Sequence, residues 1–134
     1  MTLHEMSISA IQQALSAGEL SASEIARQTL EAIARVNPQL NAWTAVTEER
    51  MLAEAENIDT LRREKRPLPP LAGVPYAVKN LFDVAGHTTL AGAELFSQRP
   101  AAAADSFAVR QLRSAGGLLT GMVNMDAYAY GFTT

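Results

Sequence analysis

Val74-Pro-Tyr-Ala-Val78 and Leu118-Leu-Thr-Gly-Met-Val123 are two short apolar runs in which polar residues do not alternate with apolar ones. Such runs are typical of strands that are buried on both faces of a sheet. Residues 105–115 lie between them and carry apolar side chains at helical spacing, at Ala108, Val109, Leu112 and Ala115. This order of strand, helix and strand predicts an α/β fold in which the two strands are parallel and helices cover both faces.

The segments around this unit contain clear start and stop signals. Asp105 is a favourable N-cap for the helix, and Gly116-Gly117 can end it. Three of the four residues in 67–70 are proline, which excludes a helix there and indicates a stiff link. Residues 88–91 favour a further short strand.

The first half of the chain predicts three helices. The second of them begins with Ser21 and Glu24, an S-x-x-E capping box in which each side chain can bond a free N–H of the first turn. It should end at Asn37-Pro38, because the residue before proline disfavours helical geometry. An extended link follows at residues 42–46. The other two helices are expected at Ser7–Ala17, stopped by Gly18, and at about Thr47–Arg63.

Charge is distributed unevenly along the chain. Residues 1–66 hold 17 of the 25 charged side chains, whereas residues 67–134 hold seven of the eight glycines. We therefore expect an N-terminal helical layer at 1–66 and the start of an α/β core at 67–134. Two or three strands with one connecting helix do not complete such a sheet, so the chain is expected to be one incomplete domain.

Composition excludes several classes of protein. The net charge of -3 gives no nucleic-acid footprint, and the absence of cysteine excludes disulfides and thiolate metal sites. No metal site or cofactor motif is present. No signal peptide or membrane-length apolar stretch is recognisable, so we expect a cytoplasmic protein that binds neither membranes nor nucleic acid directly.

Lys79 is the main candidate for chemistry. It directly follows the first apolar run, and ligand sites in α/β sheets form where strands end. A lysine in apolar surroundings can lose its proton and act as a base, although a strand-end lysine that reaches to water explains the local pattern equally simply. Asn124-Met125-Asp126 follows the second run and either lines a pocket or caps the next segment. Asp83 and Asp126 could pair, but a turn or cap role is simpler.

The wider motif resembles the amidase signature family. Residues 71–86, with Thr88-Thr89 and Gly92, resemble its lysine segment. Asp105, Val109 and Leu112–Gly116, followed by Gly121–Asp126, resemble its next block in order and spacing. The resemblance implies the N-terminal portion of that family's fold, a mixed sheet covered by helices.

Within the family, Lys79-Asn80 and the ending 124–134 are most similar to the carboxybiuret hydrolases of cyanuric acid breakdown. The glutamine-hydrolysing component of glutamyl-tRNA(Gln) amidotransferase, GatA-like in type, is the nearest alternative, but it usually has aspartate where Asn80 stands. The family also commonly has Lys-Thr in place of Met122-Val123, an acidic residue in place of Ala127 and serine in place of Ala93. These departures affect the expected substrate more than the class.

Family membership implies amide hydrolysis by a Ser–Ser–Lys relay without a cofactor, and only Lys79 carries over as a catalytic residue. Both serines of the relay belong to a Gly/Ser-rich region that these 134 residues do not contain. Tyr130 and Gly131 align with positions that line the acyl pocket. The resemblance also implies a small, urea-like amide substrate, and either a homodimer or a complex with a small partner subunit.

By itself, the 134-residue chain is expected to be inactive. A non-enzymatic alternative is a truncated fragment that serves as a binding or scaffold piece, with an exposed apolar sheet edge paired to another chain.

Overall fold

The centre of the fold is a three-stranded mixed sheet. The computed structural model describes residues 2–132, and its strands are β1 (Trp43–Val46), β2 (Pro75–Lys79) and β3 (Leu118–Val123). They lie in the order β1-β3-β2, with β2 parallel and β1 antiparallel to β3. The predicted parallel pair is confirmed. The predicted link at 42–46 is extended, but it forms a strand of the sheet.

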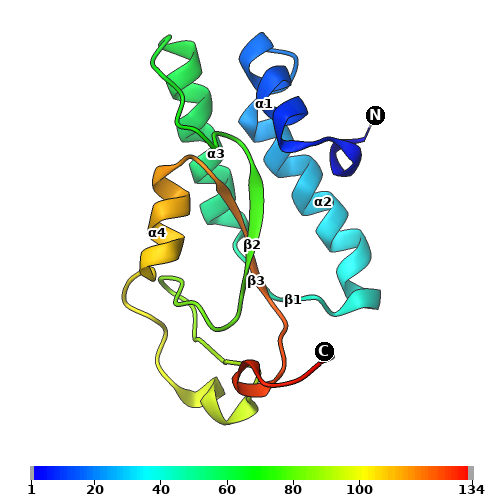
Figure 1. Ribbon diagram of the computed structural model, residues 1–134, viewed down its shortest axis with the longest axis vertical. Coiled ribbons are helices and arrows are strands. Elements are labelled where there is room, and N and C mark those ends of the chain that lie inside the picture. Colours follow the sequence, from blue (N-terminus) through cyan, green and yellow to red (C-terminus); the bar gives the residue numbers. More distant parts are fainter. Residues whose placement is uncertain (1, 133–134) are drawn as a thin grey trace.

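Helices cover both faces of this sheet (Figure 1). On one face, α1 (Ile8–Ala17), α2 (Ala22–Leu40) and α3 (Glu48–Arg63) share a core with Leu118. On the other, Val109 of α4 (Phe107–Ser114) packs with Val78, Leu119 and Met122. Leu118 and Leu119 thus point to opposite faces, as expected for a strand buried on both sides. Three short 3-10 helices complete the elements: η1 (Leu3–Glu5), η2 (Glu94–Gln98) and η3 (Ala127–Ala129).

The N-terminal helices begin and end largely as predicted. Ser7 and Ser21 cap α1 and α2, Glu24 completes the capping box, and Gly18 ends α1 in the left-handed conformation. The predicted end of α2 at Asn37-Pro38 is wrong, because the helix continues to Leu40. Asn37 stabilises this last turn, since its main-chain oxygen accepts from the Asn41 N–H and its side chain makes two hydrogen bonds to the main chain of Trp43.

The expected cap of α4 is also wrong. Ser106, rather than Asp105, caps the helix by accepting from the Val109 N–H. Asp105 instead accepts from the Ala85 N–H at 2.9 Å and from the Arg50 guanidinium at 2.8 Å. Of the residues expected to face inward, Ala108 is exposed and Val109 is fully buried.

Asp105 makes the stability of the fold dependent on acid. Burial raises the pKa of its carboxyl, but Arg50 and the Ala85 N–H outweigh this effect and hold the pKa below its usual value. A lowered pKa stabilises the fold above the unfolded-state pKa, and this stabilisation is lost as pH falls through the folded-state pKa. We expect urea unfolding to show a larger loss of stability between about pH 5 and about pH 3 in the wild-type chain than in Asp105→Asn. Equal losses would contradict this role.

A buried carboxylate joins α2 to α3. Asp59 of α3 is only 6% exposed, and its oxygens accept from the Ala22 N–H at 2.7 Å, the Ser23 N–H at 3.0 Å and the Ser23 hydroxyl at 2.6 Å. These groups form the first turn of α2, where the helix dipole favours a negative charge.

Asp59→Ala should therefore destabilise the fold strongly. The change leaves two buried N–H groups without their acceptor, and we expect a loss of about 3 kcal/mol in the free energy of unfolding, measured by urea titration. Glu24→Ala is the matched control, because it removes an exposed carboxylate from the same helix end. A loss for Asp59→Ala no larger than that for Glu24→Ala would refute the proposed join.

Within residues 2–132, no helix is both long enough and apolar enough to cross a membrane. The division at residue 66 stays a prediction. However, β1 belongs to the first part of the chain and pairs with β3 of the second, so the helical layer contributes a strand to the sheet.

Candidate functional site

The candidate site lies at the edge of the sheet where β2 and β3 both end. Lys79 is the last residue of β2 and pairs with Val123, the last residue of β3. Because the strands are parallel, the segments that follow them emerge on the same side, at the bottom of Figure 1. Sites in open α/β sheets form at this edge.

The Lys79 side chain is exposed, while its main chain is held on both sides. Its carbonyl accepts from the Phe82 N–H at 3.1 Å, and the next N–H, of Asn80, donates to Val123 O at 2.9 Å. The described residues do not provide the apolar surroundings that the sequence suggested. The reason is that β2 is an edge strand, in which Val78 is buried by α4 while Ala77 and Lys79 point to the opposite face and are exposed.

Asn80 is the most extensively bonded side chain at this edge. It is 2% exposed, its amide NH₂ donates to the Thr44 hydroxyl at 2.7 Å, and its amide oxygen accepts from the Leu90 N–H at 2.9 Å. Its main-chain oxygen accepts from the Ala91 N–H at 2.7 Å. The sequence marked Asn80 only as a departure from related proteins, because its partners lie 36 and 10 residues away along the chain.

The bonds to Asn80 explain why residues 88–91 are not a strand, contrary to the sequence prediction. The N–H groups of Leu90 and Ala91 are directed at Asn80 instead of a neighbouring strand, and Ala91 has a positive φ of 48°. The following Gly92 lies so close to the main chain of Met125 and Asp126 that a Cβ would approach their carbonyl oxygens to 2.7 and 2.8 Å. This loop therefore lies directly against the segment that follows β3.

That segment carries the two candidate substrate contacts. Tyr130 is 92% exposed, and Gly131 is exposed and packs against the Asp126 side chain. The segment is anchored by Tyr128, whose N–H donates to Ala91 O at 2.8 Å and whose ring meets Phe96 edge-on. The structure thus places Lys79, Tyr130 and Gly131 at one end of the sheet, but Tyr130 and Gly131 make no enclosed pocket within residues 2–132.

A small cavity of about 190 Å³ opens between these segments. Asn124 and Met125 line it, as one of the two sequence interpretations proposed. Asn124 also accepts from the N–H of Met125 at 3.0 Å, so it has a local turn role as well. The lining is completed by Thr44, Asn80, Leu90, Gly92, Ala93 and Glu94.

The acidic residues at this edge do not form a catalytic pair. Asp83 accepts from the Thr89 hydroxyl, which is a turn role, and Asp126 lies beside Gly131. Among the described residues, no group of three or more His, Cys, Asp or Glu side chains could hold a metal ion.

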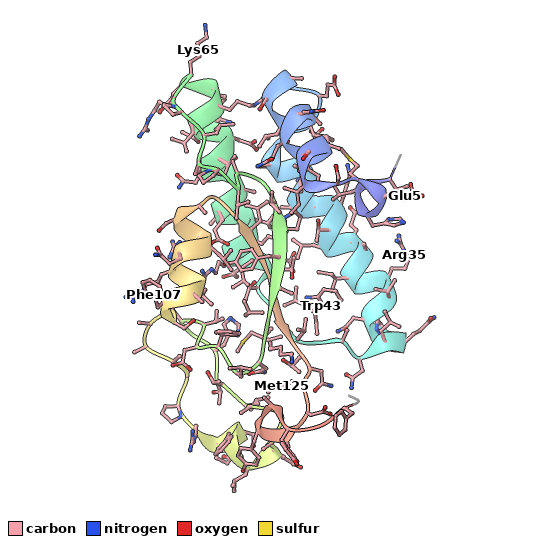
Figure 2. All side chains as sticks on the ribbon, viewed as in Figure 1. Glu5, Arg35, Trp43, Lys65, Phe107 and Met125 are labelled. Atoms are coloured by element: carbon pink, nitrogen blue, oxygen red, sulfur yellow. The ribbon has the colours of Figure 1, made fainter. Side chains whose placement is uncertain are left out.

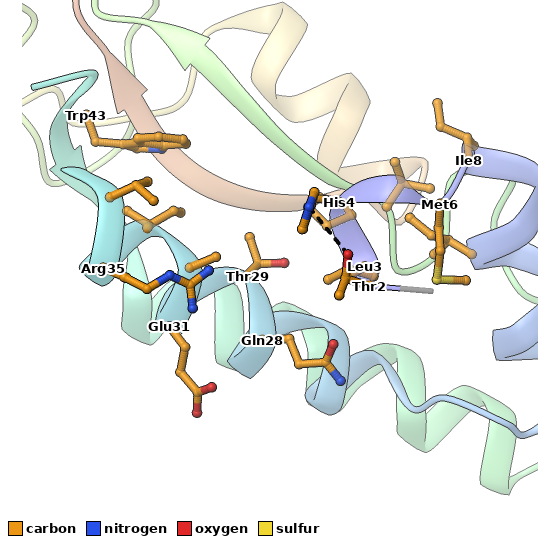
Figure 3. A pocket seen from close by; sticks show the side chains of 16 residues that line it. Thr2, Leu3, His4, Met6, Ile8, Gln28, Thr29, Glu31, Arg35 and Trp43 are labelled. Atoms are coloured by element: carbon orange, nitrogen blue, oxygen red, sulfur yellow. Dashed lines mark hydrogen bonds between the residues drawn. The ribbon is translucent and has the colours of Figure 1, made fainter. Parts of the chain in front are cut away.

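A larger, mainly apolar groove of about 570 Å³ lies at the other end of β2 (Figure 3). It is bounded by η1, by α2 and by Trp43 and Pro75 of the sheet, and Figure 2 shows Trp43 between α2 and the strands. It is lined by Val74 and Pro75, at the start of β2, whereas Lys79 ends that strand. We therefore place the candidate chemistry at the Lys79 edge.

Comparison with known proteins identifies the family. Residues 24–134, which include both motif blocks and the whole Lys79 edge, match the family model for amidases. The chain belongs to the amidase signature family. Its helices and mixed sheet match the corresponding part of that fold, as the resemblance implied.

Two curated relatives illustrate the range of the family. The chain is 47% identical over 124 residues to AtzE, a component of the 1-carboxybiuret hydrolase of Pseudomonas sp. (strain ADP), and the match covers 92% of this chain and 27% of the relative. It is 40% identical over 118 residues to the amidase component of the glutamyl-tRNA(Gln) amidotransferase of Salinispora tropica, and that match covers 87% of this chain and 24% of the relative. The chain thus spans about a quarter of the length of these relatives.

Solved structures agree with this assignment. The chain superposes with a TM-score of 0.94 and 46% identity on an inhibitor-bound vestigial protein complex said to reveal the evolutionary origins of an s-triazine catabolic enzyme. That match covers 96% of this chain and 28% of the other. The native peptide amidase of Stenotrophomonas maltophilia matches with a TM-score of 0.84 and 30% identity, covering 92% of this chain and 26% of the amidase.

Proposed function

We propose that this chain is the N-terminal part of an amide hydrolase that acts on a small, urea-like amide such as carboxybiuret. The observation that carries the proposal is Lys79 at the carboxyl edge of the sheet, inside a segment that matches the amidase family. The 47% identity to a component of a 1-carboxybiuret hydrolase supports the substrate class.

Lys79 is proposed to act as the terminal base of the Ser–Ser–Lys relay. In its neutral form it takes a proton from a serine in a cis peptide, which in turn deprotonates the nucleophilic serine. The nucleophile attacks the amide carbonyl, the C–N bond breaks as the amine leaves with a proton, and water then cleaves the acyl-enzyme. The exposed Lys79 side chain is free for this contact, because none of its atoms makes a hydrogen bond or ion pair to residues 2–132.

Tyr130 and Gly131 are proposed to line the acyl pocket. Their support is position: they follow β3 as Lys79 ends β2, and the Tyr128–Ala91 bond holds their segment against the loop after β2. Gly131 packs directly on the Asp126 side chain, so any larger residue would displace this turn.

The proposal is tested on the complete protein with carboxybiuret, a simple primary amide and glutamine as separate substrates. We expect turnover of carboxybiuret to exceed that of the other two. A second candidate is the amidase component of a glutamyl-tRNA(Gln) amidotransferase, which is favoured by the 40% identity to such a protein. Hydrolysis of glutamine without hydrolysis of carboxybiuret would reject the first candidate and support the second.

The 134-residue chain alone is predicted to hydrolyse none of these substrates, because the relay needs two serines from a Gly/Ser-rich region that its sequence lacks. Measurable turnover by the purified chain would contradict this part of the proposal. If the chain instead serves as a binding piece, it should form a stable oligomer without hydrolase activity.

We also propose that the complete protein associates with a second copy of itself or with a small partner subunit. The structure with the 0.94 TM-score is described as a protein complex, which supports association for that relative. The mass of the complete purified protein by light scattering tests the proposal, and a monomer without a copurifying partner would oppose it.

A further inference from the structure

We infer that Asn80 is a positioning residue for amide hydrolysis, which sets Lys79 and the segment bearing Tyr130 against each other. The inference rests on the proposed function. It concerns a side chain that touches neither the reacting atoms nor Lys79's amino group, and that acts through the main chain and the loops it holds.

Asn80 first fixes the strand end that carries Lys79. Its N–H donates to Val123 O at 2.9 Å, and its amide NH₂ donates to the Thr44 hydroxyl at 2.7 Å. The Thr44 hydroxyl in turn donates to Met122 O at 3.1 Å. Asn80 therefore ties the end of β2 to both other strands of the sheet.

Thr44 reaches Asn80 because β1 is irregular at this point. Trp43 pairs with Val123 and Ala45 pairs with Met122, so two residues of β1 advance for one of β3, and Thr44 is the extra residue. A bulge of this kind re-aims a side chain beside a site. Here it brings a hydroxyl that can accept from the amide while donating to a main-chain oxygen.

Asn80 also holds the loop after β2. Its amide oxygen accepts from the Leu90 N–H and its main-chain oxygen from the Ala91 N–H. Ala91 O accepts from the Tyr128 N–H at 2.8 Å, two residues before Tyr130. One buried side chain thus connects the candidate base to the candidate acyl pocket through two hydrogen-bond steps.

An amide is well suited to this position, because it offers a donor to Thr44 and an acceptor to Leu90 at once. Alanine loses both bonds. Aspartate keeps the acceptor for Leu90 and can accept from Thr44 if that hydroxyl turns away from Met122 O. Asn80→Ala should therefore be severe, and Asn80→Asp should restore most of the function.

The test uses the complete enzyme, with rates measured well below the unfolding midpoint of each variant. We expect Asn80→Ala to lower kcat ~100-fold through misplacement of Lys79, with KM changed far less. Asn80→Asp should stay within about fivefold of the wild-type kcat, the effect of roughly one hydrogen bond. Thr44→Val should lower kcat, and the double variant Thr44→Val/Asn80→Ala should be no slower than Asn80→Ala alone.

Asp59→Ala is the matched control, because it also removes a buried hub of hydrogen bonds, but between α2 and α3. We expect it to lower the unfolding midpoint while leaving kcat unchanged. The inference is overturned if Asn80→Ala keeps its kcat, if Asn80→Asp is as slow as Asn80→Ala, or if Asp59→Ala loses kcat in the same proportion.

These outcomes are separable from failure of the proposed function. If the wild-type enzyme hydrolyses amides and Lys79→Ala does not, the relay stands whatever the Asn80 variants do. Should Asn80→Ala fail to fold, the prediction rests on Asn80→Asp and Thr44→Val, and normal kcat in Thr44→Val would then overturn it.

Discussion

Lys79→Ala is expected to lower kcat/KM of the complete protein for its amide substrate at least about 100-fold, because the relay loses its base. The loss should appear in acylation, as removal of the base slows formation of the acyl-enzyme and leaves substrate binding largely intact. It can be measured from steady-state rates and from the rate of acyl-enzyme formation in single-turnover experiments.

The same change should leave stability almost unaltered. Lys79 is exposed and its side chain makes no hydrogen bond or ion pair within the described part of the chain, so its truncation removes little that stabilises the fold. Lys65→Ala is the natural control. Lys65 is the other lysine of the chain and lies just beyond α3, on an exposed turn. Near-normal turnover in Lys79→Ala, or equal losses in the two variants, would remove Lys79 from the mechanism.

The sequence predicted the parts of the fold that depend on local pattern. The apolar runs at 74–78 and 118–123 became β2 and β3, and the capping box at Ser21 and Glu24 formed as expected. Both rest on interactions within a few residues or on burial of a continuous run. For the same reason the sequence placed Lys79 correctly at the end of a strand.

Features that depend on distant partners could not be predicted. Asp105 and Ser106 are both good caps, and only the approach of Arg50, 55 residues away, decides which of them caps α4. Residues 88–91 favour a strand locally, but Asn80 takes their N–H groups. The exposure of Lys79 follows from the position of β2 at the edge of the sheet, and strand order is not written in a local pattern.

Gly121→Ala is expected to be the most damaging substitution for the fold. Gly121 lies within β3 at a φ of 154°, and a Cβ there would collide with the carbonyl oxygen of Ala45 and approach Val46 Cα and the Trp43 ring to 3.0 Å. The obstructing atoms belong largely to the main chain of β1 and cannot move without breaking the β1–β3 ladder.

The ladders on both sides of β3 change register next to this glycine. Gly121 pairs with Val46 on one side and with Ala77 on the other, and each ladder skips one residue nearby. Overpacking and backbone strain together predict a loss of about 3 kcal/mol or more in the free energy of unfolding. Because the bulge at Thr44 depends on the same ladder, we expect the bond between Thr44 and Asn80 to be lost as well.

Gly86→Ala separates backbone strain from collision. Gly86 also has a positive φ, of 84°, but a Cβ added there meets nothing within 4 Å. It should cost only the roughly 1–2 kcal/mol of a left-handed alanine. Urea unfolding of the two variants measures the difference directly. If Gly121→Ala were no less stable than Gly86→Ala, the close approach of β1 to β3 could not be what requires glycine at position 121, and the register of the sheet that presents Lys79 would need another cause.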